Sequence, residues 1–408
     1  MKIKLIATVS LLLVLWLGGS CAHAQDFDNR LSSIVKPYIF SIMKWELRTI
    51  PREANQWIFG RYEKADDEVH TVTEYFSFIE RIKSLKSAID AINANNREGN
   101  LASLEAELNR THERKMALED TVERIIEKQV RETLAQQGIF NPLDEYISLK
   151  VSFPPINFKL EKPPLLLVIS PRDRIESIRE ITLQTSISLK EIEVTEAKID
   201  ELGVSSLVTQ IGGSATYPSL VTNEASLQFT IDAVTEEWLH QYLAFKPLGF
   251  LYVLDLTGLR RNYDIATMNE TMAGMVSKEI GSIVYGKYYS QPENSASQDQ
   301  VDELESDFNR EMREIRKAVD TYLARGEIEQ AEEFMEQKRQ YLASMNYYIR
   351  KLNQAYFAFH GTYADSPISI SPIGFELKEL RNQSASLKDF LNTVATMTSR
   401  QNLRDSIK

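Results

Sequence analysis

The chain is almost free of thiols. Cys21 is the only cysteine among 408 residues, so the chain relies on no intramolecular disulfide, even in an oxidising compartment. The absence of any thiol after residue 21 also disfavours a cysteine hydrolase. Residues 212–214, Gly-Gly-Ser, lack the spacing of a serine-hydrolase elbow or of a phosphate-binding loop, and we interpret them as a turn.

An excess of positive charge is absent as well. The 47 lysines and arginines are outnumbered by 58 aspartates and glutamates, which gives a net charge of -11 and a pI near 5.2. Nucleic-acid binding needs a basic surface, so we expect no nucleic-acid partner. The composition also gives no support for a cationic membrane-surface patch. The remainder, 43% hydrophobic and 26% charged, is ordinary for a globular protein of two or three structural units.

The N-terminus carries an apolar run of targeting length. Residues 5–17 are apolar and follow Lys2 and Lys4, which is typical of a signal peptide and short for a spanning helix. Residues 22–24, Ala-His-Ala, form an A-x-A cleavage site. Two alternatives remain open: a lipid anchor on Cys21, whose lipobox-like leucine stands one position too far upstream, and an uncleaved membrane anchor. All three predict export to the periplasm or cell envelope.

Two pairs of helices flank the middle of the chain. Apolar residues recur at intervals of three and four from 63 to 137, and the turn at 93–99 is rich in breakers, which predicts an antiparallel helical hairpin. We expect this hairpin to bury its own apolar seam and to fold apart from the core. The same spacing resumes at Val301 and breaks at Gly326. Between the pairs, alternation over 146–221 predicts a small mixed sheet.

The fold class is therefore α+β and mostly helical. We divide the chain into a signal peptide or membrane anchor (1–25), an N-terminal packing segment (26–62), a helical hairpin arm (63–140), a core (141–290) and a C-terminal helical region (291–408).

One helix of the core carries the residues with the most chemistry. Residues 235–245 read TEEWLHQYLAF and are apolar on nearly all sides, so we expect the helix to be buried. Glu236 and His240 stand four apart and share a face. A buried carboxylate and imidazole need a partner, because desolvating them alone is costly. Glu270 opens a second helix about thirty residues later, and Gly274 on its face would allow close helix approach.

These two segments resemble the core of a gluzincin zinc metallopeptidase. That family places H-E-x-x-H on one helix and a glutamate of an N-E-x-x-x pattern on the next. The two histidines and that glutamate hold zinc, and the motif glutamate activates the metal-bound water. The resemblance implies that His240 is the second histidine ligand, Glu270 the third ligand and Glu237 the general base. Glu236 occupies the place of the first histidine.

A second resemblance covers a wider stretch, from Phe153 to Gly361, and thus most of the chain after the targeting segment. Over this stretch the chain is also similar to a group of bacterial membrane-associated proteins that carry an intact His-Glu-Trp-Leu-His. The implied fold is a gluzincin-like core with a small mixed sheet, flanked by long helical hairpins. Residues 353–365 are dense in aromatics around His360, which either lines the cleft or is a structural histidine.

The glutamate at position 236 leaves the chemistry open. Two carboxylates and one imidazole fit manganese or magnesium better than a two-histidine set would, although a glutamate oxygen can also ligate zinc. Glu236, Glu237 and Glu270 would repel one another unless a cation or protons neutralise them. A zinc site, another divalent metal, a site without metal and an ordinary hydrogen-bonded helix pair are all consistent with the sequence.

The expected function is that of an exported, membrane-associated metallopeptidase. Its substrate would be a protein or peptide, and metal-activated water would hydrolyse the peptide bond. The alternative is a catalytically inactive pseudopeptidase or envelope scaffold, which binds a partner through the cleft or the helical arm. The sequence specifies neither the substrate nor the oligomeric state.

Overall fold

The computed structural model describes residues 22–42, 45, 67–94, 100–143, 150–290 and 298–407. The targeting segment predicted for residues 1–25 lies outside this part, except for its last four residues, which begin helix α2 (Ala22–Val35). Most of residues 43–66 in the predicted N-terminal packing segment also lie outside it. Among the described helices, none is both long and apolar enough to cross a membrane.

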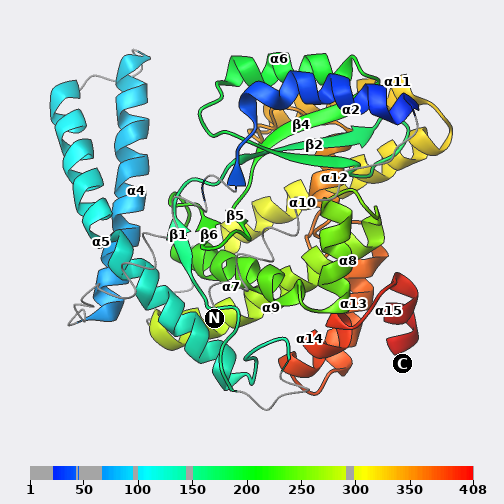
Figure 1. Cartoon of the computed structure of the whole chain (residues 1–408). Helices are drawn as coiled ribbons and strands as arrows, with labels where there is room; N and C mark the ends of the chain where they lie inside the picture. The colour runs from blue at the N-terminus through cyan, green and yellow to red at the C-terminus, as the bar shows by residue number, and fades with distance from the viewer. Residues whose placement is uncertain are drawn as a thin grey trace.

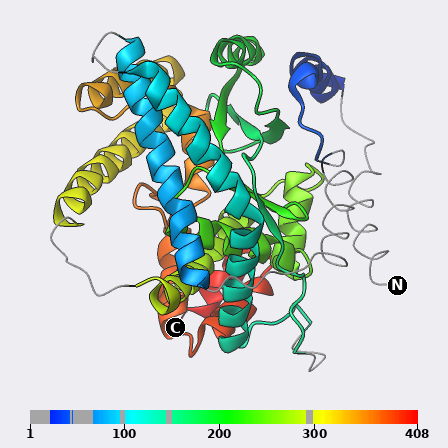
Figure 2. The ribbon, with the colours of Figure 1, turned by 90° about the vertical axis from the view of Figure 1, so that its left-hand side faces the viewer.

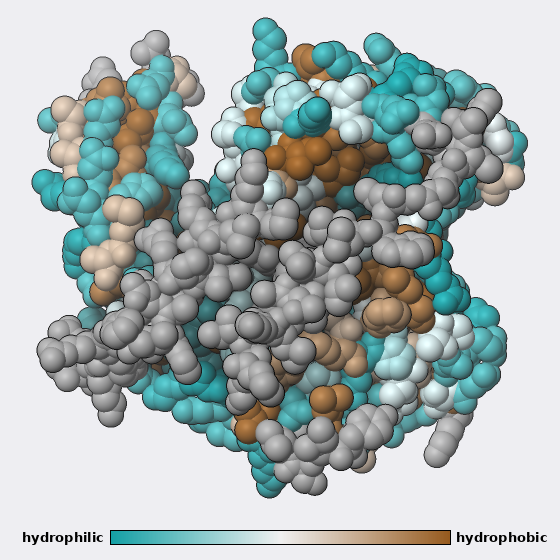
Figure 3. All heavy atoms as spheres, in the orientation of Figure 1, coloured by the Kyte–Doolittle hydropathy of each residue, from teal (hydrophilic) through white to brown (hydrophobic). Residues whose placement is uncertain are grey.

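Two long antiparallel helices, α4 (Glu68–Asn93) and α5 (Leu101–Gln136), stand at one side of the molecule (Figure 1 and Figure 2). Asp67 and Asn100 cap them, because each side chain accepts a backbone N–H three residues later, at 2.9 and 3.1 Å. Figure 3 shows the apolar seam between the two helices and polar residues on the outside. This is the pair of helices that the three-and-four spacing predicts.

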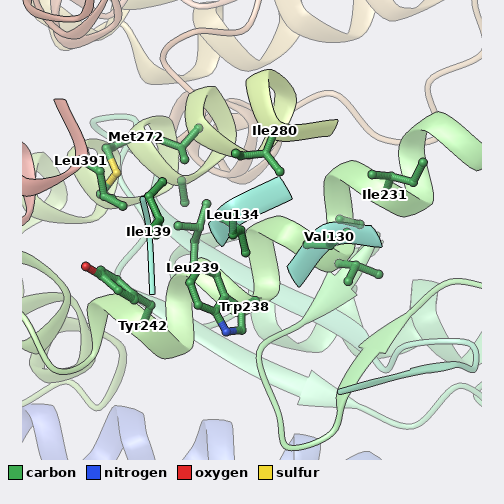
Figure 4. Packing of buried hydrophobic residues seen from close by; sticks show 14 of the residues in the cluster. Val130, Leu134, Ile139, Ile231, Trp238, Leu239, Tyr242, Met272, Ile280 and Leu391 are labelled. Carbon is green, nitrogen blue, oxygen red and sulfur yellow. The ribbon is translucent and has the colours of Figure 1, made fainter. Parts of the chain in front are cut away.

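The hairpin is not separate from the core, contrary to the sequence-based expectation. Val122, Val130 and Leu134, in the second half of α5, are buried in one hydrophobic cluster with Trp238 (Figure 4). Removing the hairpin would therefore expose a large part of that cluster. The spacing predicted the seam between the helices correctly, but it gave no sign that the same helix also presents side chains to the core.

The strands form two small sheets rather than the single one predicted. The first has the order β1-β6-β5, with β1 parallel to β6 and β5 antiparallel to it, so it is mixed. The second has the order β3-β2-β4 and is antiparallel. Their bounds are β1 Phe158–Leu160, β2 Leu165–Pro171, β3 Arg179–Leu183, β4 Val204–Gln210, β5 Gly213–Ser214 and β6 Ser219–Val221.

Each sheet is held by helices. Leu31 and Val35 of α2 share a hydrophobic cluster with Leu167 of β2, and helix α6 (Leu189–Asp200) packs on β4. The 3₁₀ turn η1 (Lys36–Tyr38) follows α2. The mixed sheet lies against helix α7 (Leu227–Leu243), as Figure 1 shows.

Three helices form the centre of the molecule. They are α7, α8 (Pro247–Leu256) and α9 (Tyr263–Tyr288). Leu239 and Trp238 of α7 pack with Met272 and Ile280 of α9 in the main cluster (Figure 4). The indole N–H of Trp238 donates to the carbonyl of Pro154 at 2.8 Å, which satisfies its only polar atom in the core.

The remaining helices close the structure around this centre. Their bounds are α10 Gln298–Ala324, α11 Ile328–Ser344, α12 Gln354–Gly361, α13 Pro372–Gln383, α14 Leu387–Ala395 and α15 Arg400–Ser406. Helices α10 and α11 share a hydrophobic cluster of their own, α12 packs on β2 and β4, and α13 and α14 pack on α9. A mostly helical α+β fold with a small mixed sheet is thus confirmed.

Glu123 joins α5 to strand β1. Its carboxylate oxygens accept the Leu160 backbone N–H and the Lys159 ammonium, both at 2.8 Å. The residue is only 3% exposed. Burial raises the pKa of Glu123 from 4.5 to about 7, although both of these partners lower it.

This pKa predicts a pH-dependent stability. As pH rises from about 4.5 to about 7, the unfolded chain releases the Glu123 proton while the folded chain keeps it, so the free energy of unfolding should fall. Glu123→Gln should flatten that decline, because an amide does not titrate. Urea denaturation at several pH values in this window measures the slope, and Glu105→Gln on the exposed side of α5 is the control. Equal slopes in wild type and Glu123→Gln would contradict the prediction.

Candidate metal centre

Helices α7 and α9 lie side by side and present the residues that the sequence singled out. The Ser226 side chain caps α7 by accepting the Phe229 N–H at 3.3 Å, and Asn262 caps α9 by accepting the Ile265 N–H at 3.1 Å. The apolar faces of both helices are buried together in the main cluster. The polar residues Glu236, Glu237 and His240 are left half-buried on the remaining arc of α7.

The three predicted ligands converge. One ligand atom each from Glu236, His240 and Glu270 can be chosen so that all three lie within 4.8 Å of one another. His240 Nε2 lies 3.7 Å from Glu270 Oε1. Glu270 is buried and the other two are half-buried, so the cluster could hold a metal ion.

The second nitrogen of the His240 imidazole is also held. Its Nδ1 lies 3.0 Å from the Asn269 side-chain nitrogen, and Asn269 Oδ1 is buried without a hydrogen-bond partner among the described residues. If the side-chain amide of Asn269 is rotated by 180°, its Oδ1 would accept a hydrogen bond from the Nδ1–H of His240. The lone pair on His240 Nε2 would then face Glu270. A metal-binding histidine is usually oriented by such an acceptor. The orphaned oxygen therefore fits a ligand role for His240.

Two tyrosines bind Glu270, and no motif in the sequence assigned a role to either. Tyr252 of α8 donates its hydroxyl to Glu270 Oε1, and Tyr363 also donates to Glu270. Burial, with the charge of Glu270 next, raises the pKa of both phenols well above 10, so both remain neutral donors. Tyr363 lies in the aromatic segment around His360, but no spacing in the sequence connects either tyrosine to Glu270.

The carboxyl groups of α7 are held close to one another in a poorly solvated place. Burial first, and Glu270 second, raise the pKa of Glu236 to about 8. Burial, Glu236 and Glu270 raise the pKa of Glu237 well above its ordinary value of 4.5. Without a cation Glu236 keeps its proton at neutral pH, and a bound cation would favour the ionised forms of both groups.

Strand β5 lies directly against Glu237. A Cβ atom built on Gly213 would overlap the Glu237 carboxylate, so only glycine permits this approach of backbone to side chain. Glu180 of β3 approaches from the other sheet: it accepts a hydrogen bond from Ser177 at 2.8 Å and interacts electrostatically with Glu270. The cluster thus has strand β5 of the mixed sheet against Glu237 and a carboxylate of the antiparallel sheet within electrostatic reach of Glu270.

His360 is not part of this cluster. Its ring lies 4.3 Å from the ring of Tyr356, and burial lowers its pKa to about 4. It lines a separate cavity of about 270 Å³ with Tyr263, Arg316 and Arg400. Of the two interpretations left open for His360, lining the metal cleft is not what the structure shows.

Comparison of the chain with protein-family models, with curated proteins and with solved structures finds no match. The likeness to gluzincins therefore depends on the motif residues themselves. Any function assigned to the site has to come from the geometry and chemistry of its own side chains.

The tyrosine contacts predict a stability effect. Tyr252→Phe removes one donor from the buried Glu270 carboxylate and should lower the free energy of unfolding by about 1–3 kcal/mol. Chemical denaturation in the presence of a chelator measures it without any contribution from metal. Tyr348→Phe is the control, because Tyr348 is 81% exposed. If Tyr252→Phe is as stable as that control, the hydroxyl does not support Glu270.

Proposed function

We propose that the chain is a metal-dependent peptidase in which Glu236, His240 and Glu270 hold one divalent cation. The observation that carries the proposal is the convergence of the three ligand atoms within 4.8 Å, with Glu237 adjacent on the same helix. The buried, unpaired Asn269 Oδ1 beside His240 supports a ligand role for that imidazole.

The donor set favours a cation that accepts oxygen ligands. Two carboxylates and one imidazole suit manganese or magnesium as well as zinc, so the metal is to be measured rather than assumed. When bound, the cation would supply Lewis-acid chemistry, polarising a peptide carbonyl and making a water molecule more acidic. Tyr252 and Tyr363 would hold Glu270 in one orientation throughout.

Glu237 is the proposed general base. It is next to the ligand Glu236, and its carboxylate lies against the edge strand β5. An extended peptide that pairs with β5 would bring a backbone carbonyl close to Glu237. A carboxylate with a raised pKa takes up a proton more readily at neutral pH than an ordinary one. We therefore propose an unfolded protein or extended peptide as substrate.

Metal binding tests the proposal. We expect the purified full chain to bind one divalent cation, and His240→Ala to abolish that binding. Glu236→His should raise the affinity for Zn²⁺, because a neutral imidazole replaces a carboxylate. Calorimetric titration with Zn²⁺ and Mn²⁺ measures both effects. His112→Ala is the control, since His112 is also followed by a glutamate but lies on the hairpin. Folded wild type and Glu236→His that both bind no metal would refute the site.

A hydrolysis assay distinguishes the two functions that the sequence allows, an active peptidase and a binding protein without catalysis. Glu237→Gln should keep the metal and lower hydrolysis of a generic unfolded protein by about 10²–10⁴-fold. The substitution at position 236 and the projecting hairpin favour a second candidate, a binding protein that has lost catalysis. That candidate holds if wild type is inactive, if Glu236→His gains activity, and if Glu237→Gln then removes it.

We also propose export to the periplasm or cell envelope, with a membrane anchor as an option that the leader sequence leaves open. The proposal depends on Lys2, Lys4 and the apolar residues 5–17. A reporter that is active only outside the cytoplasm, fused after residue 60, should be active. An inactive fusion beside an active cytoplasmic reporter at the same position would refute export.

A further inference from the structure

The loop after helix α12 is fixed onto α9 beside the metal centre. The Thr271 hydroxyl donates to the Thr362 carbonyl at 3.1 Å and accepts the Ala364 backbone N–H at 2.8 Å. Thr271 directly follows Glu270. The side chain of Tyr363 reaches Glu270 from this loop, and the side chain of Asp365, two residues on, lies beside α9 as well.

Asp365 is a buried carboxylate with only one of its oxygens paired. Its side chain is 6% exposed, and Oδ2 accepts the Lys278 ammonium at 2.5 Å. Oδ1 is buried and has no hydrogen-bond partner among the described residues. A buried acceptor without a donor costs free energy, so the position calls for a donor that the described residues do not supply.

The side chain at position 236 lies beside the same glycine as this oxygen. A Cβ built on Gly274 would lie 3.9 Å from Asp365 Oδ1 and 4.0 Å from Glu236 Oε1, so both oxygens are directed to the same glycine of α9. Asp365 is also among the charges that act on Glu236. Glu236 can donate a hydrogen bond to Asp365 only while it carries a proton, whereas its ionised form has no hydrogen to donate.

His240, at the other end of the site, has a neighbouring polar side chain beside its second ring nitrogen. One turn further along α7, His240 has its Nδ1 beside Asn269, and its Nε2 is left for the metal. An imidazole at position 236 would find Asp365 Oδ1 in the equivalent role. Carboxylates frequently hold the second nitrogen of metal-binding histidines in this way.

We propose that Asp365 is a positioning residue for the side chain at position 236 and that its free oxygen is an acceptor for a hydrogen-bond donor there. This proposal rests on the same cluster as the proposed function, but its tests do not require bound metal. Lys278 holds the carboxylate in place from the other side.

The first test follows the imidazole introduced by Glu236→His in the metal-free full chain. Nitrogen-15 NMR should show the tautomer protonated at Nδ1, and adding Asp365→Ala should shift it towards the Nε2-protonated form. Adding Asp232→Ala should leave the tautomer unchanged. Asp232 is a matched control, because it lies one turn before position 236 on α7, also acts on Glu236 by its charge, and is directed to Gly281 instead. An unchanged tautomer in the Asp365→Ala combination overturns the proposal.

The second test covers the case in which Glu236→His does not fold. Glu236→Gln supplies an amide N–H in nearly the same volume and should raise the melting temperature. That gain should disappear in combination with Asp365→Ala and persist with Asp232→Ala. A gain that survives Asp365→Ala, or that both aspartate variants remove equally, contradicts a specific hydrogen bond.

The third measurement separates this inference from the metal site. In the Glu236→His background, Asp365→Ala should lower the Zn²⁺ affinity by about 10–100-fold, and Asp232→Ala should lower it much less. Equal losses would overturn the positioning role and leave the metal site intact. If no variant binds Zn²⁺ or Mn²⁺, the proposed function falls, and the tautomer and melting results still decide the role of Asp365.

Discussion

The close packing of α7 on α9 is the contact on which the rest of the structure depends. Trp238 and Leu239 are buried against α9, and Gly281 of α9 makes room for the acidic side chain of Asp232 on α7. A Cβ on Gly281 would overlap Asp232, and Gly274 lies beneath Glu236. The apolar faces supply the free energy of packing, and Gly281 lets the Asp232 carboxylate fit between the two helices. The packing thereby holds the acidic groups closer together than they would lie if they were free in water.

This crowding gives the site its character. Three glutamates and one imidazole face a small space, and Asp365 and Glu180 add negative charge at its edge. Among the described residues, the partners that oppose this charge include two tyrosine hydroxyls on Glu270, Lys278 on Asp365, and Ser177 and Arg261 on Glu180. Burying such a cluster costs free energy unless its charge is neutralised, and Glu236, His240 and Glu270 could hold a metal ion.

The sequence predicted the parts of this centre that follow from periodicity. Glu236 and His240 were placed on one face by their spacing, and the resemblance supplied Glu270 as their partner; all three converge. The sequence did not predict the positions of Tyr252, Tyr363 and Asp365 beside the metal centre. Each reaches it through tertiary packing, from a loop or a helix that carries no motif of its own. The two-residue strand β5 carries too few residues to show any alternation. Tertiary contact, which spacing cannot reveal, also decides that α5 belongs partly to the core.

Helix α5 has one mechanical consequence. It is a single helix of 36 residues, about 54 Å long, whose distal half stands with α4 away from the body. Its other half holds β1 through Glu123, β1 pairs with β6, and β6 pairs with β5 against Glu237. The helix therefore connects the distal part of the hairpin to the strand beside Glu237. A displacement of the distal tip would be transmitted through these hydrogen bonds to the strand beside Glu237.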